Sequence, residues 1–155
     1  MYWLNLIIPA LIFLPNVLLF RYPPANEPQE PVHEPLFLKI IEWVGRIGLI
    51  ITPLFTPYSA NSVAGEMAFM AFVVFLLIYY AGWIRFFRNG RIYEYLYLPM
   101  LEIPIPLAVA PVVCFLYASF LMQSSWVLMS ALIFGTGHII LSLKNYRAIK
   151  MDSGD

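Results

Sequence analysis

The sequence predicts an all-α integral membrane protein, a bundle of five transmembrane helices with its N-terminus outside and its C-terminus in the cytoplasm. Of the 155 residues, 61% are hydrophobic and only 12% are charged, whereas about a quarter of the residues in a soluble domain are charged. The hydrophobic residues form five long runs, and the basic residues cluster in alternate connections between them. We therefore expect a multi-pass protein of a bacterial-type inner membrane or a plasma membrane.

The length and pattern of the runs identify them as helices. An α-helix rises about 1.5 Å per residue, so about 17 to 25 residues cross a hydrocarbon core of about 30 Å. The strands of a membrane barrel would alternate apolar and polar residues, and runs such as MAFMAFVVFLLIYYAGW do not alternate. The whole chain, residues 1–155, is therefore predicted to form a single transmembrane domain.

The predicted spans follow from the hydrophobic runs in order. We expect the first run to be retained, because no basic segment precedes it and no small-residue cleavage site follows it. The later runs are separated by a small-residue turn, YSANSVAGE, a basic loop, RFFRNGRIYEY, and a tight polar turn, QSS. The five predicted spans are residues 2–20, 36–57, 67–86, 98–122 and 125–143.

The connection between the first two spans, residues 21–35, is rich in proline and glutamate and reads RYPPANEPQEPVHEP. Proline cannot continue a helix, so this predicted cytoplasmic loop favours an extended polyproline conformation. In that conformation Glu27, Glu30 and His33 share an edge, with Glu34 beside them. Because these residues lack the spacing of a metal motif, we predict a stiff spacer or a lid over the cytoplasmic mouth, with no metal and no cofactor.

The lysines and arginines give the orientation. They lie in or near the first and third connections and in the C-terminal tail, and the second and fourth connections carry none. The positive-inside rule then places the first and third loops in the cytoplasm. Within the third loop, Arg85, Arg88 and Arg91 are predicted to contact lipid headgroups or to fix the topology. The other basic residues are Arg21, Lys39, Arg46, Lys144, Arg147 and Lys150.

Two spans combine ionisable residues with small ones. A charge near the bilayer centre costs at least about 2.5 kcal/mol, so each such residue needs a partner or a function. In the second span Glu42 and Arg46 are four residues apart on one helix face, and Gly45 beside them lets another helix approach closely. In the fifth span His138 shares a face with the small or polar residues Ser124, Ala131, Gly135 and Ser142.

The fourth span contains Glu102 in LPMLEIPIPLAVAP, where four prolines interrupt the hydrophobic run. Two arrangements are open. If the regular helix begins near Pro104, the carboxylate lies close to the positive end of the helix dipole. If the helix is broken instead, its free backbone carbonyls line a cavity, as in many transporters.

Five polar residues are predicted to lie at a similar depth in the membrane, and we take them as the candidate site. Counted from the span ends, all five fall in the predicted cytoplasmic half of the membrane. We interpret them as residues that bind a ligand or relay protons, because histidine changes its charge near neutral pH. The alternative is a closed polar clasp that fixes helix packing. The five residues are Asn16, Glu42, Arg46, Glu102 and His138.

These features predict a small carrier, channel or ligand-binding protein for a small molecule or an ion. One alternative is an assembly or regulatory subunit that contacts a partner membrane protein or a second copy of the chain. A lipid-modifying enzyme is a further alternative, although no catalytic residue is identified. The formal net charge is zero, so no nucleic-acid partner is expected, and the partner that the composition requires is the lipid bilayer.

Two known families share single features with the chain. Five spans with a long first loop resemble the tryptophan-rich sensory protein family, but its Trp-x-Pro-Pro loop motif is absent, and only Tyr22, Pro23 and Pro24 are similar to it. The segment RNGRIYEYLYLP resembles part of the isoprenylcysteine-type membrane methyltransferases, but their Arg-His-Pro signature and later glutamate pair are missing. Neither family therefore assigns an activity to these residues.

Overall fold

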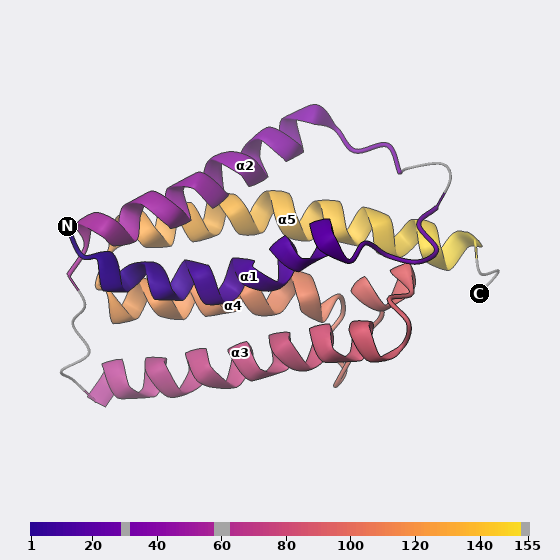
Figure 1. The fold of residues 1–155 in the computed structure, drawn as a ribbon. Helices are drawn as coiled ribbons and strands as arrows, with labels where there is room; N and C mark the ends of the chain where they lie inside the picture. Colours follow the sequence, from indigo (N-terminus) through magenta and orange to yellow (C-terminus); the bar gives the residue numbers. More distant parts are fainter. Residues whose placement is uncertain (29–31, 58–62, 153–155) are drawn as a thin grey trace.

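The computed structural model describes residues 1–28, 32–57 and 63–152 and confirms the predicted all-α class (Figure 1). Within these residues the chain forms five α-helices, which are α1 (Ile7–Arg21), α2 (Leu36–Ile51), α3 (Val63–Arg88), α4 (Pro106–Leu121) and α5 (Ser125–Asp152). Three short 3-10 helices accompany them, which are η1 (Trp3–Leu6), η2 (Thr52–Phe55) and η3 (Tyr93–Leu96).

The helices run back and forth along a common axis, so the N-terminus and the end of α5 lie at opposite ends of the bundle (Figure 1). α2 packs against α5, α5 against α4, and α4 against α3. α1 runs alongside α4 and α5 and contacts both through aromatic side chains (Figure 1). We call the end that holds the last turns of α1, α3 and α5 the basic end, because the basic residues of those turns gather there.

Three helical segments are long and apolar enough to cross a membrane, namely Trp3–Arg21, Val63–Arg88 and Ser125–Met151. α4 is apolar but shorter, and α2 has 16 residues, some of them charged. By length and composition the chain is therefore a helical bundle with three candidate transmembrane helices. The predicted arrangement of five spans requires the two shorter helices to cross as well.

The predicted start of the fourth span is wrong, because α4 begins at Pro106 and not at Leu98. Pro104 and Pro106 lack an N–H group and disfavour the helical conformation in the residues before them. Ile105, between the two prolines, has a φ of 43°, and Glu102 has a φ of 62°. The helix therefore starts at Pro106, two residues after Pro104, close to the first of the two arrangements that the sequence allows.

Other boundaries differ because hydrophobicity reveals only the apolar part of a helix. α3 and α5 extend past their predicted ranges, 67–86 and 125–143, to Arg88 and Asp152. Within the predicted second span, 36–57, the α-helix ends at Ile51 and the chain continues as the 3-10 helix η2. The polar last turns of α3 and α5 lie at the basic end, where they lengthen the bundle beyond its apolar middle.

Aromatic rings from three helices meet near the middle of the bundle. Phe13 of α1, Phe115 of α4 and Phe134 of α5 have ring centroids 5.4 to 6.0 Å apart. Phe115 and Phe134 are each only 1% exposed, and the free Cys114 is buried beside them in the same core. These residues fill the interior between the two ends of the bundle.

Hydrogen bonds hold α1 against α3 at the site of a helix-interior proline. Pro15 has no N–H group, so the carbonyl of Leu11, four residues earlier, has no helical partner. The Tyr80 hydroxyl donates to this carbonyl at 2.8 Å, and the Tyr79 hydroxyl donates to the carbonyl of Ile12 at 2.9 Å. Tyr80 thus satisfies the carbonyl that Pro15 leaves without a helical partner, and Tyr79 adds a second hydrogen bond between α1 and α3.

Candidate functional site

α2 and α5 bring a carboxylate, a guanidinium and an imidazole together. Oε1 of Glu42 accepts a hydrogen bond from Arg46 Nη2 at 2.6 Å and lies 3.0 Å from His138 Nδ1. The exposed fractions of the three side chains are 16% for Glu42, 27% for Arg46 and 19% for His138. Hydrogen bonds to charged groups are stronger than neutral ones, and more so when they are shielded from water. We call this group the Glu42 triad.

Glycines let α2 and α5 approach closely enough to form the triad. A Cβ atom on Gly137 would lie 2.7 Å from the backbone nitrogen of Glu42, and a Cβ atom on Gly45 would collide with the backbone of Phe134. Any larger residue at either position would push the two helices apart. The close contact predicted from the small residues of the second span is therefore made with α5.

Aromatic rings fix the orientation of the triad. The guanidinium carbon of Arg46 lies 5.4 Å from the ring centroid of Phe13, 5.6 Å from that of Trp43 and 5.7 Å from that of Phe134. Such cation–π contacts stabilise a cation that has lost part of its water shell. The ring of His138 stacks on Phe134 at 4.8 Å with an interplanar angle of 17°. Phe134 therefore contacts both partners of the carboxylate, Arg46 and His138.

A second polar group lies nearer the basic end. Glu34 pairs with Lys39 Nζ at 3.0 Å and accepts a hydrogen bond from Asn145 Nδ2 at 3.0 Å. The Tyr93 hydroxyl donates to Asn145 Oδ1 at 3.2 Å and lies 3.4 Å from the Tyr97 hydroxyl. Burial raises the pKa of both tyrosine hydroxyls above the usual value, so both remain protonated at neutral pH.

Both groups line one cavity of about 370 Å³, which we call the charged cavity. Its size is typical of sites for small organic molecules. Two carboxylates, one ammonium and one guanidinium line it, so their formal charges cancel as long as His138 is neutral. The lining residues are Glu34, Lys39, Glu42, Trp43, Arg46, Tyr97, His138, Leu141, Ser142 and Asn145.

Two further cavities adjoin the charged cavity. An inner chamber of about 100 Å³ shares Tyr97, His138 and Ser142 with it. A loop cavity of about 780 Å³, lined partly by the proline-rich loop, shares four residues with it, namely Glu34, Lys39, Tyr97 and Asn145. The loop cavity also shares Leu19 and Leu96 with the inner chamber, so each of the three hollows adjoins the other two, and Tyr97 lines all three.

The described part of the proline-rich loop is held against the third loop. Asn26 Nδ2 donates to both carboxylate oxygens of Glu94, at 3.0 and 3.2 Å, and Asn26 Oδ1 accepts from the backbone N–H of Tyr93 at 2.7 Å. The backbone N–H of Ala25 donates to the carbonyl of Arg91 at 2.9 Å. These bonds place the loop beside the outermost cavity, although Glu30 of the predicted acidic edge lies outside the described residues.

The structure separates the other two predicted site residues from the triad. Asn16 donates through Nδ2 to the Tyr79 hydroxyl at 2.9 Å and lines the inner chamber next to His138. Glu102 lies in the exposed turn before α4 and does not line the charged cavity. Among the described residues Glu102 has no hydrogen bond or ion pair, so the site that the geometry supports contains four of the five predicted residues.

The three arginines near the end of α3 differ in their surroundings. Arg85 Nη1 donates to the carbonyl of Pro99 at 2.8 Å, and its guanidinium carbon lies 4.8 Å from the ring centroid of Tyr95. Arg88 is exposed at the end of α3. Arg91 has a positive φ of 60° and accepts the bond from Ala25. Arg85 thus holds the turn before α4, whereas Arg88 remains available at the surface.

Sequence reasoning missed two residues that line the charged cavity. Asn145 lies seven residues after His138, which is two helical turns along the same face of α5. Extending the predicted small and polar face by one more turn would have included it. Tyr97 follows the 3-10 helix η3, where no periodic pattern signals its position.

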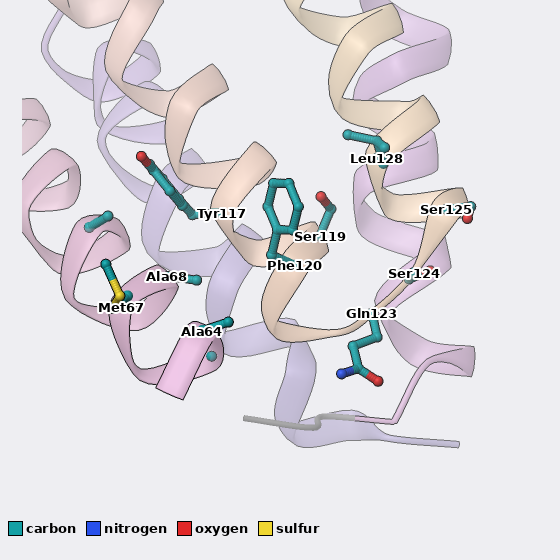
Figure 2. Close-up of a pocket in the computed structure, with 12 residues that line it drawn as sticks. Ala64, Met67, Ala68, Tyr117, Ser119, Phe120, Gln123, Ser124, Ser125 and Leu128 are labelled. Atoms are coloured by element: carbon teal, nitrogen blue, oxygen red, sulfur yellow. The ribbon is translucent and has the colours of Figure 1, made fainter. Parts of the chain in front are cut away.

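A further cavity of about 650 Å³ lies at the end of the bundle opposite the basic end. Figure 2 shows Ala64, Met67 and Ala68 of α3 on one side of it and Leu128 of α5 on the other. No charged side chain is among its described lining residues, so this cavity differs in its chemistry from the charged cavity.

No family model, no curated protein and no solved structure matches the chain. Within residues 1–28, 32–57 and 63–152, no group of three histidine, cysteine, aspartate or glutamate side chains could hold a metal ion. The geometry of the charged cavity is therefore the basis for the function proposed below.

Proposed function

We propose that this chain is a multi-pass membrane protein that binds a small polar solute in the charged cavity, as a carrier or a ligand-binding protein. The observation that supports this proposal is that the Glu42 triad lines an open cavity of about 370 Å³. Among the described residues, Glu42 Oε2 and His138 Nε2 make no hydrogen bond, so both remain available to a solute. Ionisable residues inside a membrane bundle typically mark such sites.

In the proposed arrangement all five helices cross the membrane as one domain, and the basic end faces the cytoplasm. The alternating directions of the helices and the basic residues at one end support this topology (Figure 1). Reporter fusions in a bacterial inner membrane test it. A green fluorescent protein fused after Asp155 should fluoresce, and alkaline phosphatase at the same position should be inactive. The reverse pattern would contradict the topology.

The filled interior favours a carrier or a binding protein over an open channel. Beyond the inner chamber, the rings of Phe13, Phe115 and Phe134 pack against one another. These packed rings lie between the two ends of the bundle and leave its interior filled. A carrier would need a second conformation that opens the opposite end.

Thermal unfolding in detergent with a panel of amino acids, short organic acids, amines and sugars tests the proposed binding. We expect at least one solute to raise the Tm of the wild-type protein and to have no effect on Glu42→Gln. The matched control is Glu102→Gln, which removes a carboxylate outside the cavity and should keep the response. If every solute acts equally on the wild type and on Glu42→Gln, the charged cavity is not the binding site.

A second candidate function, an assembly or regulatory subunit, is supported by the close glycine contact between α2 and α5. In such a subunit the Glu42 triad would be a closed polar cluster that stabilises the helix contact at Gly45 and Gly137. Purification from native membranes should then recover a partner protein or a second copy of the chain. A monomeric, fully folded protein that binds a solute would contradict this alternative.

A further inference from the structure

His138 forms a shared wall between the charged cavity and the inner chamber. Its Nδ1 atom lies 3.0 Å from the carboxylate of Glu42. Because an ionised carboxylate only accepts hydrogen bonds, Nδ1 carries a proton, and Nε2 of the neutral ring has a lone pair. A second proton on Nε2 would convert that atom from an acceptor into a donor.

The inner chamber is rich in hydrogen-bond donors and contains no carboxylate. Its polar lining residues are Asn16, Trp83, Tyr97, His138 and Ser142, and its other lining residues are apolar. Trp83 is 4% exposed, and its Nε1 atom makes no well-aligned hydrogen bond with any described residue. The Tyr79 hydroxyl beside Trp83 donates to the carbonyl of Ile12 and accepts from Asn16 Nδ2, and the contact between Trp83 Nε1 and this hydroxyl falls short of hydrogen-bond geometry. An unpaired buried N–H group is costly, so an acceptor in the chamber would stabilise it.

We propose that the inner chamber binds a small monovalent anion, of the size of chloride or formate, and that His138 takes up one proton when the anion binds. The chamber volume of about 100 Å³ matches such an ion better than a larger metabolite. The proton adds one positive charge, the anion adds one negative charge, and no covalent bond changes. The proposal rests on the proposed solute site, because His138 lines both the inner chamber and the charged cavity.

The charges around His138 explain why proton and anion arrive together. From α2, Glu42 and Arg46 form the triad with it, and Lys39 lines the same cavity. The proline-rich loop contributes Glu34, and the segment after η3 contributes the neutral Tyr97. α1, α3 and α4 contribute no charged residue to the chamber wall. These four charges cancel, so a protonated imidazole without an anion would leave one net positive charge in a partly buried site.

Bromide quenching of Trp83 fluorescence tests the proposal directly. A variant with Trp3→Phe, Trp43→Phe and Trp126→Phe keeps Trp83 as the single tryptophan of the chain. We expect quenching that saturates with bromide, with an affinity at pH 5.5 at least about tenfold higher than at pH 8, because proton uptake and anion binding are linked in the proposal. Quenching that rises linearly with bromide at both pH values would overturn the proposal.

The two histidines of the chain provide a matched pair of variants. In this background His138→Gln should abolish the pH dependence, whereas His33→Gln, in the exposed part of the proline-rich loop, should retain it. A pH dependence that survives His138→Gln would overturn the role of His138. If His138→Gln does not fold, proton uptake by the single-tryptophan protein in lightly buffered solution tests the coupling instead. We expect one proton to be bound per bromide, and bromide binding without proton uptake would overturn the proposal.

The outcomes separate this inference from the proposed function. If a solute binds saturably in a way that depends on Glu42 but bromide quenching does not saturate, the proposed function stands and the anion site in the inner chamber is excluded. The absence of both would exclude the solute site as well. Bromide binding that is independent of pH would contradict the coupling between the anion and the proton.

Discussion

A Cβ atom on Gly137 would lie 2.7 Å from the backbone nitrogen of Glu42. The backbones of α5 and α2 are therefore in direct contact beside the hydrogen bond between His138 and Glu42. Packing and site geometry are therefore coupled at this point. A change that separates α2 from α5 must also lengthen the bond between the carboxylate and the imidazole.

We expect Gly137→Ala to destabilise the protein more than Gly135→Ala. The new methyl group at residue 137 meets the backbone of α2, whereas at residue 135 it meets only side-chain atoms of Val112, which can shift with less displacement of a helix. Overpacking of this kind costs about 1 to 3 kcal/mol when the neighbour cannot move. Thermal unfolding in detergent measures the difference, and equal Tm values for the two variants would contradict the close backbone contact.

Removing the charge of Glu42 should destabilise the bundle, because Arg46 would lose its anionic partner. We expect about 1 to 3 kcal/mol for Glu42→Gln, less than for a fully buried pair, since the Arg46 side chain is 27% exposed. The double variant Glu42→Gln with Arg46→Met should be more stable than the sum of the single effects predicts. Additive losses in Tm would show that the two residues do not act as a pair.

Tyr80→Phe should destabilise the protein because it leaves the Leu11 carbonyl without a hydrogen bond. We expect a loss of about 1 to 2 kcal/mol. Pro15→Ala restores the N–H group that this carbonyl lacks, so Tyr80→Phe should have a smaller effect in that background. Comparison of the four proteins by thermal unfolding tests this relationship, and an unchanged effect of Tyr80→Phe would contradict it.

Asn26→Asp should release the proline-rich loop from the third loop. The asparagine amide donates to Glu94, and an aspartate would place two carboxylates against each other instead. We expect faster hydrogen exchange at Ala25 and Tyr93, whose backbone N–H groups take part in this contact. Asn89→Asp serves as the control, since Asn89 bonds only to the carbonyl of Arg85. Equal exchange in both variants would argue against this contact.

Sequence reasoning recovered the parts of the structure that depend on local pattern. Glu42 and Arg46 pair because residues four apart on a helix share a face, and His138 lies on the face of α5 that packs inward. The meeting of Glu42 with His138 was expected only as a coincidence of depth. The geometry of this contact depends on how α2 packs against α5, and the close contacts of Gly45 and Gly137 determine that packing. The periodicity of a single sequence does not reveal which helices pack together.

The misplaced start of the fourth span has a physical cause. The residues before α4 are mostly as hydrophobic as those of a transmembrane helix, so hydrophobicity alone includes them in the span. They are Leu98, Met100, Leu101 and Ile103. Backbone conformation before proline excludes them from α4 and turns the carboxylate of Glu102 toward the surface. The loop residues of the site, Glu34 and Tyr97, depend on long-range contacts and have no comparable signal.

The bond between Tyr80 and Leu11 has a consequence for the order of events during biosynthesis. The two residues are 69 positions apart, so α1 leaves the ribosome well before its hydrogen-bond partner exists. In a membrane-inserted chain, α1 would carry an unsatisfied carbonyl in lipid until α3 arrives. Pro15 thus makes the first helix dependent on the third, and a nascent chain truncated before Tyr79 should leave α1 prone to quality-control proteolysis.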